Sequence, residues 1–458
     1  MRLEKDSIGS LYIDDDAYYG IQSYRGAVNF NVIEQRINPD FVKNMARVKQ
    51  AAAKVNYEIG DLSKEKCAAI VKASQEIAEG KLYDAFIVDA IQGGAGTSSN
   101  MNANEVIANR AIELLGGKKG DYSIVHPNDD VNMAQSTNDV IPTAAKMTVI
   151  DLIKPLLVNL EKLEEAFLEK AKEFDDVLKM GRTQMQDAVP IRLGQEFKAY
   201  AAAIKRDKER IALAEKDMHL INMGGSAIGT SINVNPRYLD KIANEISKVC
   251  GYDVYLADNL IDSTQNLDCF VNVSSSLKTC AVNMAKIAGD FCLLSSGPRT
   301  GFGEINLPSM QNGSSIMPGK INPVIPEVVS QVAFLIMGHD VTINFAAASG
   351  QLELNAFGPV MYYQLFESIV ALSGAAESFT KDCVQGVTAN KDKCKENVEK
   401  SVGIITVLVP IIGYQKAADI AKEALKTGIP VRELILRDKI LNEEELDKVL
   451  VPIKMTSI

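Results

Sequence analysis

The chain has 458 residues, of which 47% are hydrophobic and 24% are charged, a balance typical of a folded protein rather than a disordered one. The formal net charge of −10 argues against a nucleic-acid partner, which would need a basic face, but allows an anionic small substrate in a locally positive pocket. The length exceeds one ordinary core, so we expect two or three domains or one long helical architecture. Aromatic residues make up only 6% and Trp is absent, which favours helix over sheet.

The first residues, Met1 to Asp6, are charged and lack the apolar core of a signal peptide. No uninterrupted apolar run approaches the roughly 18 residues of a membrane span. The seven cysteines include no C-x-x-C pair, which favours reduced thiols packed as small apolar residues. We therefore expect a cytoplasmic protein with no membrane partner.

Residues 1–140 alternate short helical stretches with glycine-rich turns and are expected to form an N-terminal mixed helical domain. Apolar residues then recur at spacings of three and four from Ile153 to Phe167, more loosely from Phe197 to Ile211, and again from Phe270 to Leu294. Pro155 lies inside the first of these patterns. It should either bend that helix or mark its start.

These three segments predict helices of roughly 25 to 35 residues, about 40–50 Å long, in a central bundle domain at residues 141–390. One chain would hardly cover such helices on all sides, so helices of other subunits are expected to complete the core. Residues 391–458 show short amphipathic helices and a surface turn at Glu443 to Glu445. They should form a small C-terminal helical domain.

Four stretches interrupt the helical pattern with small and polar residues, and interruptions of this kind are often functional. Helix capping and turn chemistry would account for any one of them equally well. Together they favour a site that lines a carboxylate-bearing ligand with hydroxyls and amides, placed where long helices begin, because helix N-termini attract anions. The stretches are residues 94–102, 135–139, 181–187 and 313–323.

The fourth stretch is the most specific. Gly313 permits an unusual backbone, Ser314 and Ser315 follow it, and Lys320 and Asn322 precede a helix that Pro323 or Pro326 would open.

Other chemistries lack the residues that they need. The three histidines include no pair with metal-ligand spacing, so a histidine-built metal site is not expected. The sequence contains neither a dinucleotide-binding Gly-x-Gly-x-x-Gly after a strand nor a Gly-Lys-Ser/Thr loop. The Gly-x-Ser-x-Gly elbow is absent too, so a Ser-His-Asp triad would have to be assembled from distant segments.

The sequence Gly-Ser-Ser-Ile-Met-Pro-Gly-Lys-Ile-Asn-Pro at residues 313–323 resembles the hallmark of the aspartase/fumarase superfamily of lyases. The resemblance covers nearly the whole chain, from Asp16-Ala17-Tyr18-Tyr19-Gly20 to the Ile-Pro-Val-Arg-Glu-Leu of residues 429–434. It is nearest to the aspartate ammonia-lyases, with class II fumarases second. It implies a mainly α, three-domain lyase whose central long helices form a twenty-helix core in a homotetramer, with each active site built from three subunits.

The resemblance also assigns roles to residues. Ser314 would be the general base that removes the Cβ proton of L-aspartate, which leads through an aci-carboxylate to fumarate and ammonia. Asn138 would lie near the leaving amino group, and Ser315 would assist. The substrate carboxylates would be held by Thr97, Ser136, Thr137, Thr183, Lys320 and Asn322, with Gln184 beside them. We expect no organic cofactor and no metal ligand among these residues, and activation by a divalent cation stays an open alternative.

Gln184 distinguishes the two nearest families. Fumarases carry histidine at this position, paired with the acid that corresponds to Glu327, whereas aspartases show histidine or glutamine. Because glutamine cannot relay a proton, addition of water is disfavoured. Thr137 also matches aspartases better than fumarases.

Three departures from the aspartase pattern leave the amine substrate open. They lie at Ala348-Ser349, at Gly358 and at Val409, and together they remove two acids and an amide that the family usually carries there. The alternatives are a fumarase, a lyase that releases fumarate from an N-substituted aspartate, and a non-enzymatic helical tetramer. The intact stretch at residues 313–323 argues against the last of these.

Overall fold

In the computed structural model, which describes residues 1–313, 315–451 and 455–456, the chain divides into two compact units. The first unit comprises Met1–Leu157, Glu209–Thr279 and Leu335–Leu372, and the second comprises Val158–Lys208, Cys280–Phe334 and Ser373–Ile458. The boundaries fall within long helices rather than between consecutive segments. The three consecutive domains expected at 1–140, 141–390 and 391–458 therefore remain a prediction.

The first unit begins with an antiparallel hairpin of β1 (Arg2–Lys5) and β2 (Ser10–Ile13). Helices α1 (Ile21–Asn29), α2 (Pro39–Ile59), α3 (Lys64–Ala78) and α4 (Thr97–Leu114) follow. The bounds of α2 follow from its sequence, since Asn38 caps its N-terminus, Pro39 occupies the first position, and Gly60 ends it with a φ of 92°.

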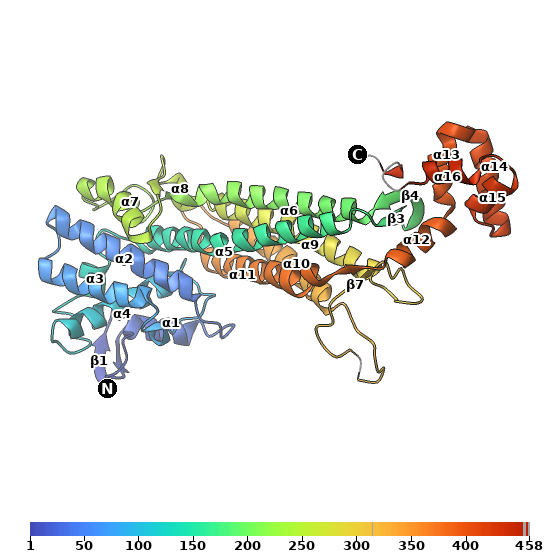
Figure 1. The fold of residues 1–458 in the computed structure, drawn as a ribbon. Coiled ribbons are helices and arrows are strands. Elements are labelled where there is room, and N and C mark those ends of the chain that lie inside the picture. The colour runs from blue at the N-terminus through green and yellow to red at the C-terminus, as the bar shows by residue number, and fades with distance from the viewer. Residues whose placement is uncertain (314, 452–454, 457–458) are drawn as a thin grey trace. The chain divides into compact units, whose positions relative to one another are not determined.

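Helix α2 packs against α3 and against α7 (Pro236–Cys250), and α3 packs against α4 (Figure 1). The short helix α8 (Asp262–Gln265) and the parallel pair β5 (Leu220–Ile221) and β6 (Tyr255–Leu256) complete this unit's small elements. Its core includes the rings of Phe41, Tyr362, Phe366 and Phe270, with neighbouring centroids 5.0 to 6.4 Å apart.

Five helices are long, and three of them confirm the periodic segments of the sequence. They are α5 (Thr137–Glu173), α6 (Leu193–Glu215), α9 (Asp268–Leu294), α10 (Val324–Ala348) and α11 (Gly358–Asp382). The expectation that Pro155 would mark a helix start is wrong. Helix α5 begins at Thr137, where orphan backbone N–H groups are capped, and both Pro142 and Pro155 lie inside it.

The core of the second unit is an aromatic cluster. The ring of Phe167 on α5 lies 6.2 Å from Phe197 on α6, 6.2 Å from Phe291 on α9 and 6.0 Å from Phe379 on α11. All four side chains are buried. Phe167, Phe197 and Phe291 belong to the three apolar stripes read from the sequence, so these stripes are surfaces that pack, and Phe379 is added from α11.

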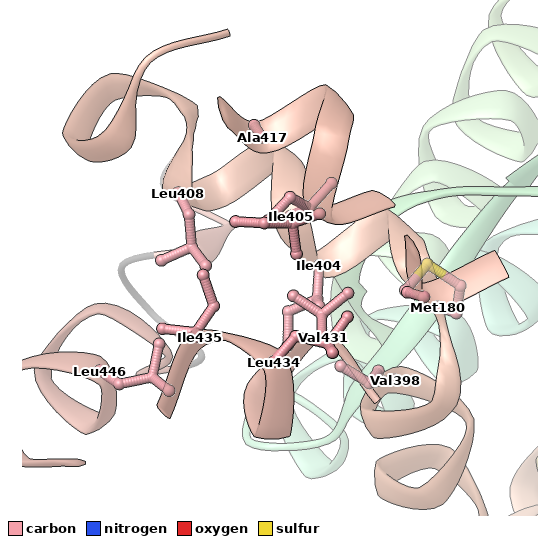
Figure 2. Packing of buried hydrophobic residues seen from close by; sticks show 12 residues of the cluster. Met180, Val398, Ile404, Ile405, Leu408, Ala417, Val431, Leu434, Ile435 and Leu446 are labelled. Atoms are coloured by element: carbon pink, nitrogen blue, oxygen red, sulfur yellow. The ribbon is translucent and has the colours of Figure 1, made fainter. Parts of the chain in front are cut away.

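The second unit also contains two antiparallel strand pairs, β3 (Leu178–Thr183) with β4 (Gln186–Arg192), and β7 (Ile305–Asn306) with β8 (Thr388–Ala389). Among the described residues, β8 is followed by five short α-helices, namely α12 (Lys391–Lys400), α13 (Ile405–Ile412), α14 (Tyr414–Thr427), α15 (Val431–Arg437) and α16 (Glu443–Val449). Their apolar faces meet in one cluster that includes Val398, Leu408 and Leu434, and Met180 of β3 joins it (Figure 2).

The expected surface turn at Glu443 to Glu445 is wrong. These residues form the first turn of α16, where Asn442 and Glu445 make a reciprocal capping box. Three acidic side chains are favourable there because the N-terminus of a helix carries partial positive charge.

Helix α10 keeps a largely apolar surface exposed in the single chain. Phe334 is 63% exposed, Val341 55% and Phe345 72%. By length and composition alone α10 could cross a membrane, with a mean hydropathy of 1.3 in its most apolar window. A core helix of a soluble protein passes the same test, so a single helix of this kind is weak support for a membrane span.

Candidate functional site

The residues that the sequence singles out fall into both units. Thr97, Ser136, Thr137 and Asn138 belong to the first unit, and Thr183, Gln184, Ser315, Lys320 and Asn322 belong to the second. Ser314, the expected base, lies outside the described residues. We describe the two groups separately.

Thr97 is the first residue of α4. Its hydroxyl donates to the carbonyl oxygen of Gly94 at 2.8 Å, and the residue is exposed. The turn before it contains Gly96 with a φ of 95°, a backbone conformation that favours glycine. The first turn of α4 carries no acidic side chain, so its N-terminal partial charge is available to an anionic ligand.

Ser136, Thr137 and Asn138 lie at the N-terminus of α5. The Ser136 hydroxyl accepts a hydrogen bond from the backbone N–H of Asn138 at 3.2 Å, and Thr137 Oγ1 accepts one from the side-chain amide of Asn100 at 3.3 Å. The expectation that the polar stretches stand where long helices begin is thus confirmed for α4 and α5.

Sequence reasoning missed the role of Asp139, whose side chain is fully buried. Its carboxylate accepts backbone N–H groups from Ser136 at 2.9 Å and from Gly224 and Ser226 at 3.1 Å each. Burial raises the pKa of Asp139 to about 6, against the opposing effect of these hydrogen bonds and of Lys49. The group is therefore ionised at neutral pH and ties two loops together.

The second of these loops also contacts Asn138 directly. The side-chain amide of Asn138 donates to the carbonyl oxygen of Ala227 at 2.7 Å, and that of Asn222 donates to the Asn138 carbonyl at 3.0 Å. The glycines of the sequence Gly-Gly-Ser-Ala-Ile-Gly-Thr at residues 224–230 were the signal that could have identified this loop.

Lys49 of α2 is a second buried group that the sequence gave no reason to select. Its side chain is fully buried, and its ammonium donates to Asn132 Oδ1 at 2.7 Å. Asn100 donates to the same oxygen at 3.2 Å and to Thr137, so three hydrogen bonds, through Asn132 and Asn100, connect Lys49 to Thr137. Burial lowers the pKa of Lys49 to about 7, and the charge of Asp139 opposes that shift.

In the second unit, Thr183 and Gln184 lie at the tip of the β3–β4 hairpin. Thr183 pairs with Gln186, so Gln184 and Met185 form a two-residue turn, with φ values of 53° and 64°. All four residues are exposed. The expectation of a helix start is therefore wrong for this stretch. A two-residue hairpin needs positive φ at both central positions, and two ordinary residues adopt it here.

Residues 307–313 and 315–323 contain no regular helix or strand and precede α10. An added side chain at Gly313 would overlap the carbonyl oxygen of Lys320, since its Cβ would lie only 1.3 Å away. The backbone at Gly313 thus closely approaches the backbone at Lys320, which requires glycine at position 313. Helix α10 begins at Val324, as the prolines predicted. Lys320 and Ser315 are exposed and Asn322 is half-buried.

Unfavourable backbone conformations gather in the candidate stretches. Among the described residues, eleven other than glycine have positive φ, and five of these lie in or beside the segments above. Such conformations cost about 1–3 kcal/mol each and tend to persist at functional sites. They are Ala95, Ala134, Gln184, Met185 and Ser226. This concentration favours function over ordinary turn chemistry.

Gly358, Val409 and Ser349, at which the sequence departs from the aspartase pattern, have different structural surroundings. A Cβ at Gly358 would lie 2.8 Å from the Tyr362 ring, so the buried tyrosine fits only beside glycine. Tyr362 borders a cavity of about 60 Å³ that is too small for an amino acid but has room for water. Val409 packs against the C-terminal cluster, and the exposed Ser349 donates to the Phe345 carbonyl.

Chemically, the two groups supply hydroxyls, carboxamides, helix N-termini and the cation of Lys320. This inventory suits a ligand with carboxylates, because charge-assisted hydrogen bonds from a cation and neutral donors both bind and orient such groups.

Comparison with known proteins places this geometry in context. The family described as "Lyase" matches residues 9–338, and the family described as "Fumarase C C-terminus" matches residues 404–457. The aspartate ammonia-lyase of a Bacillus species is 51% identical over 456 residues, which cover 100% of this chain and 97% of the relative. That of Bacillus subtilis (strain 168) is 49% identical, with 99% and 96% covered.

Solved structures agree with these matches. A fumarate lyase:delta crystallin from Brucella melitensis, bound to cobalt, is 47% identical with a TM-score of 0.97, and the match covers 100% of both chains. A recombinant class II fumarase from Schistosoma mansoni is 34% identical with a TM-score of 0.96, covering 100% of this chain and 99% of that one. The mainly helical lyase fold expected from the sequence is confirmed.

The buried junction at Asp139 makes a first prediction. Asp139→Asn replaces one acceptor oxygen by an N–H donor that faces backbone N–H groups, so the loops at residues 136–138 and 224–227 should separate. We expect catalytic turnover to fall about 10- to 100-fold. Any acid limb near pH 6 that arises from protonation of Asp139 should vanish, because asparagine does not titrate. Steady-state rates between pH 5 and 9 measure both effects.

Asp340→Asn is the matched control. Asp340 is also a buried acid of the first unit, but it accepts from Ser274 and Lys278 within the helices. The Asp340→Asn substitution should leave the pH profile unchanged. An unaltered acid limb in Asp139→Asn would contradict the role given to Asp139.

Proposed function

We propose that this chain, which belongs to the aspartase/fumarase superfamily of lyases, is an aspartate ammonia-lyase that converts L-aspartate reversibly to fumarate and ammonia. That the chain is a carbon–nitrogen lyase follows from near-full-length relatives of that activity at about half identity. The observation that carries the finer assignment is this likeness together with Gln184 in place of a histidine. The relatives named above as aspartate ammonia-lyases support the same substrate.

The proposed chemistry starts at Ser314. Its Oγ, as the alkoxide, takes the Cβ proton of aspartate, and the electron pair of the C–H bond moves into the β-carboxylate to give an aci-carboxylate. Collapse of that species forms the Cα–Cβ double bond and expels the amino group as ammonia with the C–N electron pair. Ser314 then returns its proton to ammonia or to solvent.

The double charge of the aci-carboxylate is the main energetic obstacle, so preorganised donors should provide the largest catalytic effect. Lys320 supplies the formal charge for one carboxylate. Thr97, Ser136, Thr137, Thr183 and Asn322 supply neutral donors, with Ser315 assisting and Asn138 beside the amino group. Strained loops and helix N-termini fix these donors before substrate binds, which lowers the reorganisation that the reaction requires. We propose that these groups suffice without an organic cofactor.

We further propose a cytoplasmic homotetramer. The support is the apolar surface of α10, with Phe334 and Phe345 more than half exposed in one chain. Apolar area removed from water stabilises association by about 25 cal/mol per Å², so a helix of this kind favours burial against other copies. In such an assembly, the first-unit and second-unit groups of one active site would come from different subunits.

The substrate assignment makes the second prediction. Purified protein given L-aspartate should release fumarate, followed by its ultraviolet absorbance, with an equimolar amount of ammonia. L-Malate and N-substituted aspartates are tested in parallel. Fumarate from L-malate alone would show a fumarase, and release only from an N-substituted aspartate would move the assignment to that alternative.

The third prediction concerns the base. Ser314→Ala should lower kcat by about 10³-fold or more, because no other group takes the Cβ proton, while the oligomeric state by gel filtration stays unchanged. Ser315→Ala is the matched control, since it removes the neighbouring hydroxyl and should retain much more activity. Near-wild-type turnover in Ser314→Ala would remove serine as the base.

A further inference from the structure

A buried ion-pair cluster lies directly behind Thr183 in the second unit. Arg182 of β3 donates to Glu304 through two nitrogens, at 2.7 Å to Oε1 and 3.2 Å to Oε2. Lys179, three residues earlier on the same strand, lies 3.3 Å from Glu304 Oε2 and 2.9 Å from Glu196. The side chain of Glu304 is 0% exposed. The two acids and two bases balance in charge.

Backbone geometry accounts for this convergence. Side chains three residues apart on a strand point to opposite faces, yet those of Lys179 and Arg182 reach one carboxylate. The β3–β4 register shifts between Met180 and Arg182, so that β4 has one residue more than β3 opposite Gly181. A β-bulge increases local twist, and we attribute the shared partner to it. A Cβ at Gly181 would lie 2.7 Å from the Val189 carbonyl oxygen, so the bulge fits only against glycine.

Glu304 is itself held by the chain around it. Its N–H donates to the carbonyl oxygen of Leu294 at the end of α9, and its carbonyl accepts from the N–H of Asn390 at 2.9 Å. The amide of Asn397 on α12 donates to Glu304 Oε1 at 3.2 Å. Strand β7 directly follows Glu304, pairs with β8 and leads into residues 307–313. These contacts therefore hold Glu304 in place just before strand β7 and the residues that follow it.

The other side of the same strand is fixed by packing. Met180 is buried in the C-terminal cluster beside Val398 of α12 (Figure 2). The Arg182 guanidinium also lies 4.2 Å from the ring centroid of Phe302. Thr183 is thus preceded by three residues that are each held, whereas Thr183 and the tip after it are exposed.

The pKa shifts of Glu304 and Arg182 both favour the charged forms of this ion pair. Burial alone would raise the pKa of Glu304, but the Arg182 hydrogen bonds and the Lys179 charge outweigh it and hold that pKa below its usual value. Burial alone would lower the pKa of Arg182, but the hydrogen bonds and the charge of Glu304 outweigh that effect and raise it. Buried ion pairs are seldom the most stable filling of a core, so their fixed geometry is the more informative property.

We infer that Arg182 and Glu304 are positioning residues, which set the place of the Thr183 hydroxyl relative to residues 307–313 by locking the hairpin and strand β7, which precedes these residues, to one buried carboxylate. Neither touches substrate. The inference rests on the proposed function, since it gives Thr183 the role of a carboxylate ligand.

A double-mutant cycle tests this inference. Arg182→Lys keeps the charge but cannot make both bonds to Glu304, so kcat/KM should fall about 10- to 100-fold, with Arg182→Met lower still. Thr183→Val in the wild-type background should lower kcat/KM by a similar factor. In the Arg182→Lys background the Thr183 hydroxyl is already misplaced, so adding Thr183→Val should lower kcat/KM by less than about threefold further.

Two controls separate positioning from general destabilisation. Thr97→Val, in the first unit, should keep its full effect in the Arg182→Lys background. Lys208→Met breaks an ion pair to Glu164 at 3.0 Å in the same unit, away from the hairpin, and should change kcat/KM by less than about twofold. Full additivity of Arg182→Lys with Thr183→Val would overturn the inference.

Hydrogen exchange needs no substrate, so it tests the inference separately from the proposed function. In Glu304→Gln, hydrogen exchange should accelerate at the amides of residues 178–192 but not in α5 or α6. Unchanged exchange in the hairpin would overturn the inference. If wild-type protein is silent with L-aspartate and acts on another succinyl compound, the proposed function fails, and the same kinetic cycle is run with that compound.

Discussion

The apolar surface of the long helices is the constraint on which the rest of the structure depends. Helix α10 presents Phe334, Val341 and Phe345 to solvent in a single chain, although the other long helices bury their stripes within the units. The free energy of removing that surface from water favours association with further copies. Association would also give each proposed active site its full set of groups, because the residues proposed to bind the carboxylates are divided between two units.

Beneath each group of donors lies a buried polar network rather than an apolar core. In the first unit Asp139 joins the loops at residues 136–138 and 224–226, and Lys49 reaches Thr137 through Asn132 and Asn100. In the second unit Glu304 holds Arg182 next to Thr183. Buried charges are costly to desolvate, but they tolerate few geometries, and fixed donors are what a developing dianion needs.

Much of this was predictable from the sequence. The periods of three and four from Ile153 to Phe167 and from Phe270 to Leu294 predicted α5 and α9, and the motif at residues 313–323 predicted the family. The hairpin at Thr183 was not predicted, because a two-residue turn without glycine gives a weak local signal. The helix that begins at Glu443 was not predicted either, because its capping box is a short local pattern. Lys49 and Glu304 could not be predicted, since their partners are distant in sequence. The nine described site residues and the three domain bounds stay predictions.

The account's central claim is that donors from different subunits complete each active site, and subunit complementation tests it most directly. Thr137→Val and Lys320→Met each damage the donors of one unit. The two variants are unfolded together, mixed in equal amounts and refolded. If each site draws its Thr137 and its Lys320 from different chains, about a quarter of the sites receive both intact residues, and aspartate-dependent fumarate release should recover to roughly that fraction of wild type. Hybrids no more active than the separately refolded parents would contradict the claim and place each complete site within one chain.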